Sequence, residues 1–213
     1  MSTKILLLVC LAAIQLAAVE PAAQAKPTAP ASAQEARPIA VGSGAPLSAT
    51  ARRSDGTAVT LAAVLGGKPT VVVFYRGGWC PFCTRHLAGL AGVIPDLNAA
   101  GWAIVAVVPD QPSVLAATLA KGDEGVPRLS DAGGELMLGF GVAYRVDDAT
   151  DAKLKGYKID LAAASGNNQR LLPVPSVFLV AADGTVRFVH AEADYKVRLD
   201  PQALLAVART AAK

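Results

Sequence analysis

Two cysteines separated by two residues, Cys80 and Cys83, are the residues of this 213-residue chain best suited to chemistry. They lie in the stretch FYRGGWCPFC, residues 74–83, directly after Trp79. Cysteines at this spacing serve as a redox dithiol, as a peroxide-reducing thiol or as half of a zinc site. A disulfide across so short a loop restricts the unfolded chain little, because its stabilising effect grows with loop length. The spacing therefore favours a chemical role over a purely structural one.

The pair lies where a buried strand is expected to end and a helix to begin. The apolar, β-branched run TVVVFY, residues 70–75, is typical of a strand buried on both faces. N–H groups in the first turn of the following helix have no helical partners, and the macrodipole places partial positive charge there. Both effects lower the pKa of a cysteine thiol. Pro81 suits a first-turn position because it has no N–H to lose, while Arg76 and Arg85 add positive charge nearby in the sequence.

The elements around this junction alternate between strands and helices. We expect one helix from Thr84 to Ala100, kinked by Pro95, and a polar insert at 146–170 that forms a loop or a weak helical excursion and could shape a substrate entrance. The other expected elements are hairpins at 47–61 and 176–190, strands at 102–109 and 126–131, and helices at 112–120, 134–140 and 200–211. This order predicts an α/β sandwich with a central mixed β-sheet flanked by helices and an N-terminal β-hairpin extension.

The N-terminus has the pattern of a secretory signal. Lys4 precedes an apolar run at 5–19, and the small-x-small sequence at 23–25 is a cleavage site. A retained membrane anchor is the alternative, but the run is shorter than the roughly 20 residues that a spanning helix needs. We therefore expect a signal peptide over residues 1–25 and an exported protein, periplasmic or secreted, with no membrane segment after cleavage.

The mature chain is expected to consist of a linker and one domain. Residues 26–40 are rich in Pro, Ala and Ser without an apolar period, and predict a disordered linker before a domain over 41–213. Cleavage removes Cys10 and leaves Cys80 and Cys83 as the only thiols. In an oxidising compartment such a lone pair either forms a disulfide or cycles through one.

Composition and motifs exclude several other functions. The net charge of +3 is spread along the chain and gives no support for nucleic-acid binding. There is no G-x-G-x-x-G after a strand and no C-x-x-C-H, so neither a nicotinamide, a flavin nor a haem cofactor is expected. Electrons must then come from an external dithiol donor, whose identity the sequence does not show, and the oligomeric state is equally hidden.

The segment VVVFYRGGWCPFC resembles the active-site segment of thioredoxin-fold redox proteins, in which Trp-Cys-x-x-Cys follows the central strand. The later stretch PVPSVFLVAADGTVRF is similar to the part of that fold where a cis-proline faces the cysteines. The resemblance implies that Pro175 is this proline, with Pro173 as the competing choice. Trp79 is then expected to pack over the edge of the dithiol.

Within this fold, residues 41–212 most closely resemble the peroxiredoxin-like family, the alkyl hydroperoxide reductase/thiol-specific antioxidant branch. Its motif is Pro-x-x-x-Thr-x-x-Cys. Laid on this sequence, the motif puts the peroxidatic cysteine at Cys83, the threonine at Cys80 and the proline at Arg76. The family also carries an arginine after the late hairpin, which DYKVRLDP supplies as Arg198. The resemblance thus implies an antioxidant, peroxide-reducing enzyme, with two departures from the motif.

Three functions follow from these residues. In the first, the Cys83 thiolate attacks a peroxide, Cys80 resolves the sulfenic acid as a disulfide, and Arg198 stabilises the thiolate and the peroxide. In the second, Cys80 attacks a protein disulfide in the manner of thioredoxin and Cys83 resolves the mixed disulfide. In the third, the protein is a metal carrier, since Cys80, Cys83 and His86 have zinc-like spacing; only His190 remains as a further histidine, and no metal site is predicted.

Overall fold

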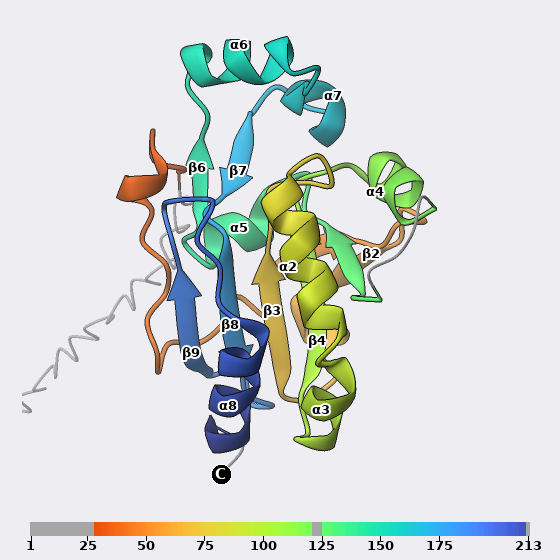
Figure 1. The fold of residues 1–213 in the computed structure, drawn as a ribbon, viewed down its shortest axis with the longest axis vertical. Helices are drawn as coiled ribbons and strands as arrows, with labels where there is room; N and C mark the ends of the chain where they lie inside the picture. The colour runs from red at the N-terminus through yellow and green to blue at the C-terminus, as the bar shows by residue number, and fades with distance from the viewer. Residues whose placement is uncertain (1–27, 121–124, 212–213) are drawn as a thin grey trace, which may run out of the picture.

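The computed structural model describes residues 28–120 and 125–211 (Figure 1). Its elements, in chain order, are η1 (Ala33–Glu35), β1 (Thr50–Arg52), β2 (Ala58–Thr60), α1 (Leu61–Leu65), β3 (Thr70–Phe74), α2 (Pro81–Ala91), α3 (Ile94–Ala99), β4 (Ala103–Val108), α4 (Pro112–Leu119), β5 (Arg128–Ser130), α5 (Glu135–Gly139), β6 (Ala143–Arg145), α6 (Asp148–Gly156), α7 (Leu161–Ser165), β7 (Leu171–Pro173), β8 (Ser176–Val180), β9 (Val186–Ala191) and α8 (Pro201–Ala211).

Seven strands form one mixed sheet in the order β2-β1-β5-β4-β3-β8-β9. Strands β3, β4 and β5 run parallel, while β8 and β9 continue the sheet antiparallel beyond β3. The β1–β2 hairpin pairs antiparallel with β5 and extends the opposite edge. The predicted mixed sheet with an N-terminal hairpin extension is confirmed.

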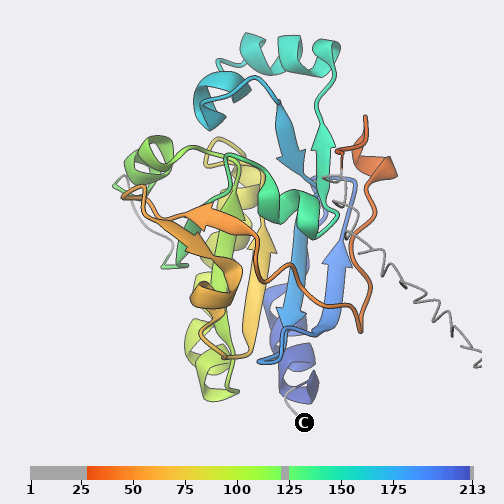
Figure 2. The same ribbon diagram turned by 180° about the vertical axis from the view of Figure 1, so that it is seen from behind.

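Helices cover both faces of this sheet (Figures 1 and 2). Helices α2, α3, α4 and α8 pack on one face and α1 and α5 on the other. The central strand β3 explains the two layers, because its successive side chains point to opposite faces. Val71 and Val73 join the core beneath α2, whereas Val72 and Phe74 join the core beneath α5. All five residues of β3 are buried, as the apolar run predicts.

The segment expected to form one kinked helix at 84–100 forms two helices instead. Helix α2 ends at Ala91 and α3 begins at Ile94, with Pro95 in its first turn. A proline is tolerated in a first turn, where its missing N–H is not needed, but disrupts the interior of a helix. The break lets α2 keep Leu87 and Leu90 buried against the sheet.

The insert at 146–170 contains two helices, α6 and α7, in place of the expected loop or weak excursion. They connect β6 to β7, which pair as a separate two-stranded sheet, and they lie beyond the end of β3 where α2 begins (Figure 1). Asp147 caps α6 by accepting from the N–H of Thr150, and Asp160 caps α7 by accepting from that of Ala163.

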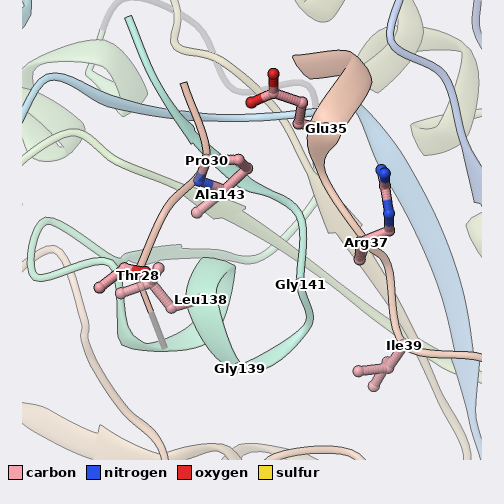
Figure 3. Close-up of a pocket in the computed structure, with 9 residues that line it drawn as sticks. All are labelled: Thr28, Pro30, Glu35, Arg37, Ile39, Leu138, Gly139, Gly141 and Ala143. Carbon is pink, nitrogen blue, oxygen red and sulfur yellow. The ribbon is translucent and has the colours of Figure 1, made fainter. Parts of the chain in front are cut away.

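The described part of the expected disordered linker is instead packed on the domain. The N–H of Ile39 donates to Phe140 O at 3.0 Å, and that of Arg145 donates to Pro30 O at 2.8 Å. Ala36 is buried in the core beneath α5. The segment and the α5–β6 region border a cavity of about 550 Å³ that no thiol lines (Figure 3). A composition rich in small alanine side chains is typical of a linker. The same small side chains let the backbone of this segment approach the domain closely.

The expected signal peptide, residues 1–25, lies outside the described residues. Within 28–120 and 125–211, no helix has the length and apolar character needed to cross a membrane.

Candidate active site

Both cysteines lie at the start of α2. This helix begins beyond the end of β3 (Figure 1). Cys80 is the N-cap residue, Pro81 follows in the first turn, and the N–H groups of Cys83 and Thr84 donate to Cys80 O at 2.9 and 3.1 Å. The exposed fractions of the two cysteines are only 1% and 0%, and both are free thiols. The predicted strand-to-helix junction is therefore present and encloses both sulfurs.

The turn before the cysteines depends on a glycine. Gly77 has a φ of +148°, and a Cβ built there would come 2.2 Å from Trp79 Nε1. The indole thus folds back over this turn, which only a residue without a side chain allows. Trp79 lies beside the dithiol as expected, since it lines the same pocket as Cys80.

Arg198 contacts the thiol of Cys83 although 115 residues separate them. Its Nη2 donates to Cys83 Sγ at 3.4 Å, and its Nη1 donates to Val197 O at 2.7 Å. The backbone N–H of Arg76 also donates to the Cys83 sulfur. A guanidinium, a backbone N–H and the first turn of a helix therefore all stabilise negative charge on this sulfur.

The interaction between the two thiols moves their pKa values in opposite directions. Interaction with Cys83 lowers the pKa of Cys80 to about 6, with smaller lowering effects from the charges of Arg76 and Arg198. The same interaction, together with burial, raises the pKa of Cys83. Of the two thiols, Cys80 therefore loses its proton more readily.

Arg76 is a buried cation next to Cys80. Its exposed fraction is 6%, and its guanidinium lies 4.9 Å from the ring centroid of Trp79 and 4.4 Å from that of Tyr195. It also hydrogen-bonds the hydroxyl of Tyr144. Two aromatic faces and one hydroxyl replace part of its hydration, and its charge helps to lower the pKa of Cys80. Arg76 therefore belongs to the surroundings of the dithiol, as its place in the sequence suggested.

A pocket of about 390 Å³ opens above Cys80. The junction, the insert and the loop after β9 all contribute to its lining: Arg76, Trp79, Cys80, Pro81, Phe82, Thr150, Lys153, Leu154, Tyr157, Ile159 and Tyr195. Cys83 does not line it and is buried in the core beneath α2. Of the two thiols, Cys80 is the one that borders this pocket.

The expectation of a cis-proline at Pro175 is wrong. The described residues contain no cis peptide bond, at Pro175, at Pro173 or elsewhere. Pro175 lies between β7 and β8, and its carbonyl accepts from the N–H of Glu192 at 3.2 Å. The trans backbone here continues from the β6–β7 sheet into the main sheet, so the chain passes between two sheets without a reversal.

His86 and His190 are near Arg198 but form no metal site with the cysteines. Burial, more than the charge of Arg198, lowers the pKa of His86 to about 4, so its imidazole is neutral at physiological pH. Across 28–120 and 125–211, no cluster of three or more His, Cys, Asp or Glu side chains is arranged to hold a metal ion.

Two contributors to the site were not identified from the sequence. Tyr144, on β6, contacts Arg76, and Lys153, on α6, lines the pocket. The sequence does contain a pattern that indicates the helix of Lys153, because Asp147 three residues before Thr150 is a helix-capping pattern. Nothing in the sequence around Tyr144 indicates its pairing with a residue 68 positions earlier.

Comparison with protein families matches residues 41–189, a segment that includes the dithiol, to the AhpC/TSA family. The chain belongs to the AhpC/TSA family. As a member, it is a thiol-dependent oxidoreductase with the thioredoxin-like fold described above. The resemblance inferred from the sequence is confirmed. A search of curated proteins found no match.

Solved structures of AhpC/TSA-type proteins share the fold of this chain. Peroxiredoxin Q from Xanthomonas campestris is 24% identical, with a TM-score of 0.60 over 78% of this chain and 93% of that one. Reduced Prx3 from Vibrio vulnificus in complex with hydrogen peroxide is 18% identical, with a TM-score of 0.63 over 80% and 96%. Peroxidoxin BcpB from Mycobacterium tuberculosis is 19% identical, with a TM-score of 0.61 over 81% and 97%.

Proposed function

We propose that this protein reduces peroxides at Cys83, with Cys80 as the resolving thiol and an external dithiol as the electron donor. The observation that carries the proposal is the hydrogen bond from Arg198 Nη2 to Cys83 Sγ at 3.4 Å. It places a permanent positive charge at the sulfur that must carry negative charge during attack. The same guanidinium is suited to donate to the peroxide oxygens as the O–O bond breaks.

Cys80 acts first as the proton acceptor for Cys83. Because the pKa of Cys80 is lowered to about 6, its thiolate is available to accept the proton of Cys83. Transfer of that proton leaves the thiolate on Cys83, where Arg198 and the N–H of Arg76 stabilise it. A short proton transfer therefore activates Cys83 despite its raised pKa.

The reaction then balances in two steps. The Cys83 thiolate attacks one oxygen of R–O–O–H, giving Cys83–S–OH and an alkoxide, and the Cys80 thiol protonates the alkoxide to R–OH. The Cys80 thiolate next attacks the sulfenic sulfur, forming the disulfide and releasing hydroxide. Sulfur has lost two electrons and the peroxide has gained them. An external dithiol restores both thiols by exchange and leaves as its own disulfide.

Two further observations support peroxide as substrate. The family assignment rests on a segment that contains both cysteines and Arg76. The Vibrio vulnificus Prx3 structure, similar in fold, is a complex with hydrogen peroxide. We infer that a peroxide is also the substrate here, with Arg198 beside Cys83 as a donor to its oxygens.

Turnover of hydrogen peroxide by the reduced protein, with a thioredoxin as donor and no small thiol present, tests this proposal. We expect wild type to consume peroxide, Cys83→Ser to lose turnover, and Cys80→Ser to react once per molecule before stalling as the sulfenic acid. Oxidation of wild type no faster than that of an ordinary free thiol would refute the peroxidase function.

Disulfide exchange initiated by Cys80 is the second candidate function. It is favoured by a specific observation, since Cys80 lines the pocket and loses its proton more readily than Cys83. Mixed-disulfide trapping separates the two. If exchange is the function, a mixed disulfide with a partner protein accumulates on Cys80 in Cys83→Ser and is absent from Cys80→Ser.

We further propose that residues 1–25 direct export and are then removed, so that the enzyme works in the periplasm or outside the cell. The support is the charged, apolar and small-residue pattern of the N-terminus. Mass determination of the protein from an exporting host tests this. A mature chain beginning at Lys26 is expected, and an uncleaved N-terminus would contradict the proposal.

A further inference from the structure

Arg198 reaches Cys83 from a loop without regular secondary structure. This loop, residues 192–199, connects β9 to α8, and we call it the arginine loop. Its backbone is attached to the domain at its first residue, where the N–H of Glu192 donates to Pro175 O at 3.2 Å. Ordering the residues of a loop costs conformational entropy. Further contacts must therefore hold the arginine loop if the guanidinium is to stay at the sulfur.

Tyr195 lies in a tight turn within the arginine loop. The N–H of Val197 donates to Asp194 O at 3.0 Å and closes the turn, while the carboxylate of Asp194 accepts from the N–H of Lys196 at 3.0 Å. An aspartate at the first position stabilises such a turn. Arg198 follows directly after it, so a contact that fixes Tyr195 also limits where Arg198 can lie.

The ring of Tyr195 contacts the dithiol segment before and after Cys80. Its centroid lies 4.4 Å from the guanidinium carbon of Arg76. It also lies 5.8 Å from the ring centroid of Phe82, the residue directly before Cys83, with an angle of 79° between the two rings. Cation–π and edge-to-face contacts of this kind are attractive. Tyr195 therefore connects the arginine loop to the segment that carries both sulfurs.

We propose that Tyr195 is a positioning residue that holds Arg198 at Cys83. Tyr195 lines the pocket that Cys80 borders, whereas Cys83 is buried in the core beneath α2. Its effect on Cys83 therefore passes through Arg198. The aromatic ring carries this role, because the contacts with Arg76 and Phe82 are both made by the ring. The inference rests on the peroxidase function proposed above, in which Arg198 stabilises the thiolate and the peroxide.

The test is the rate at which the reduced protein reacts with hydrogen peroxide, measured by stopped flow. Tyr195→Leu should slow the oxidation of Cys83 about tenfold, the combined effect of one cation–π contact and one aromatic pair. Tyr195→Phe keeps the ring and should react as wild type does. An unchanged rate in Tyr195→Leu, or a Phe variant as slow as the Leu variant, would overturn the proposal.

Val197→Ala is the matched control from the same loop. Val197 is 44% exposed and does not line the pocket, and the substitution keeps the backbone hydrogen bonds of the turn. It should leave the rate unchanged. If Val197→Ala slows the reaction as much as Tyr195→Leu does, any loss of side-chain volume in the arginine loop has this effect, and the assignment to Tyr195 is wrong.

A double-mutant cycle separates the positioning of Arg198 from a general effect on the fold. If Tyr195 acts through Arg198, Tyr195→Leu should slow the reaction by less than about twofold once Arg198 is replaced by Gln. A tenfold loss in both backgrounds would show that Tyr195 acts independently of Arg198 and would overturn the proposal.

A measurement without peroxide distinguishes failure of this inference from failure of the proposed function. Interaction with Cys80 and burial raise the pKa of Cys83, and the charge of Arg198 lowers it. In the Cys80→Ser background, Tyr195→Leu should therefore raise the pKa of Cys83, measured from the ultraviolet absorbance of the thiolate. A raised pKa in a protein that reduces no peroxide would refute the peroxidase and retain the positioning role. Rapid peroxide reduction with an unchanged pKa would refute the positioning role and retain the peroxidase.

Discussion

Cys83 faces the guanidinium of Arg198 and the core beneath α2, whereas Cys80, three residues earlier, faces Arg76 and the pocket below α6. The first environment stabilises charge and excludes solvent. The second borders the pocket and lowers the pKa of its thiol. Two almost fully buried sulfurs thus divide the tasks of the site, since Cys83 has the charged donor at its sulfur and Cys80 loses its proton more readily.

The largest effect is expected on the Cys83 side of the comparison. Arg198→Gln should slow the reaction of Cys83 with hydrogen peroxide about 100-fold, because it removes a charged donor aimed at the reacting atoms. Stopped-flow oxidation of the reduced protein measures this. Arg85→Gln, an exposed arginine of α2, is the control and should leave the rate unchanged. Equal rates for wild type, Arg198→Gln and Arg85→Gln would show that the contact between Arg198 and Cys83 does not contribute to catalysis.

A smaller effect is expected on the Cys80 side. The charge of Arg76 helps to lower the pKa of Cys80, so Arg76→Met should raise that pKa and leave less thiolate at pH 6. We expect alkylation by iodoacetamide at pH 6 to slow about fivefold. The rates of wild type and Arg76→Met should converge at high pH, where Cys80 is deprotonated in both proteins. Arg76→Lys retains the charge at this buried position and should restore most of the rate. A Lys variant as slow as the Met variant would indicate packing as the cause.

The smallest effect is expected from a substitution of His86. It tests whether the inflection expected near pH 6 in the pH dependence of alkylation comes from the thiols. Because burial lowers the pKa of His86 to about 4, its imidazole does not titrate between pH 5 and 8. His86→Gln should therefore leave the midpoint of the pH–alkylation profile where it is in wild type. Loss of the inflection in this variant would assign it to the imidazole and contradict the lowered pKa of Cys80.

The sequence predicts the core of the site well, because local chemistry determines it. The buried run of β3, Pro81 in a first turn and the C-x-x-C spacing are sufficient to place both thiols at a helix start. Arg198 was reached only through the family resemblance, since no local pattern indicates a contact across 115 residues. The dithiol itself can be read from the sequence, whereas its long-range partners cannot.

The errors have a common physical origin in tertiary packing. The segment at 28–40 has the composition of a linker, but burial of Ala36 and backbone hydrogen bonds with Phe140, at the end of α5, and Arg145, on β6, hold it on the domain. The polar composition of the insert predicts a loop, whereas the capping residues Asp147 and Asp160 start helices in it. The family resemblance implies a cis bond at Pro175, whereas the backbone between β7 and β8 is trans.

The central claim is that Cys83 is the sulfur that meets the peroxide. The most direct test is to mix reduced Cys80→Ser and reduced Cys83→Ser with one equivalent of hydrogen peroxide, trap sulfenic acid with dimedone and locate the adduct by mass spectrometry. The account predicts rapid labelling of Cys83 in Cys80→Ser, because the variant loses the interaction with Cys80 that raises the pKa of Cys83 and keeps Arg198 at the sulfur, and slow labelling of Cys80 in Cys83→Ser. Rapid labelling of Cys80 with Cys83 unlabelled would contradict it.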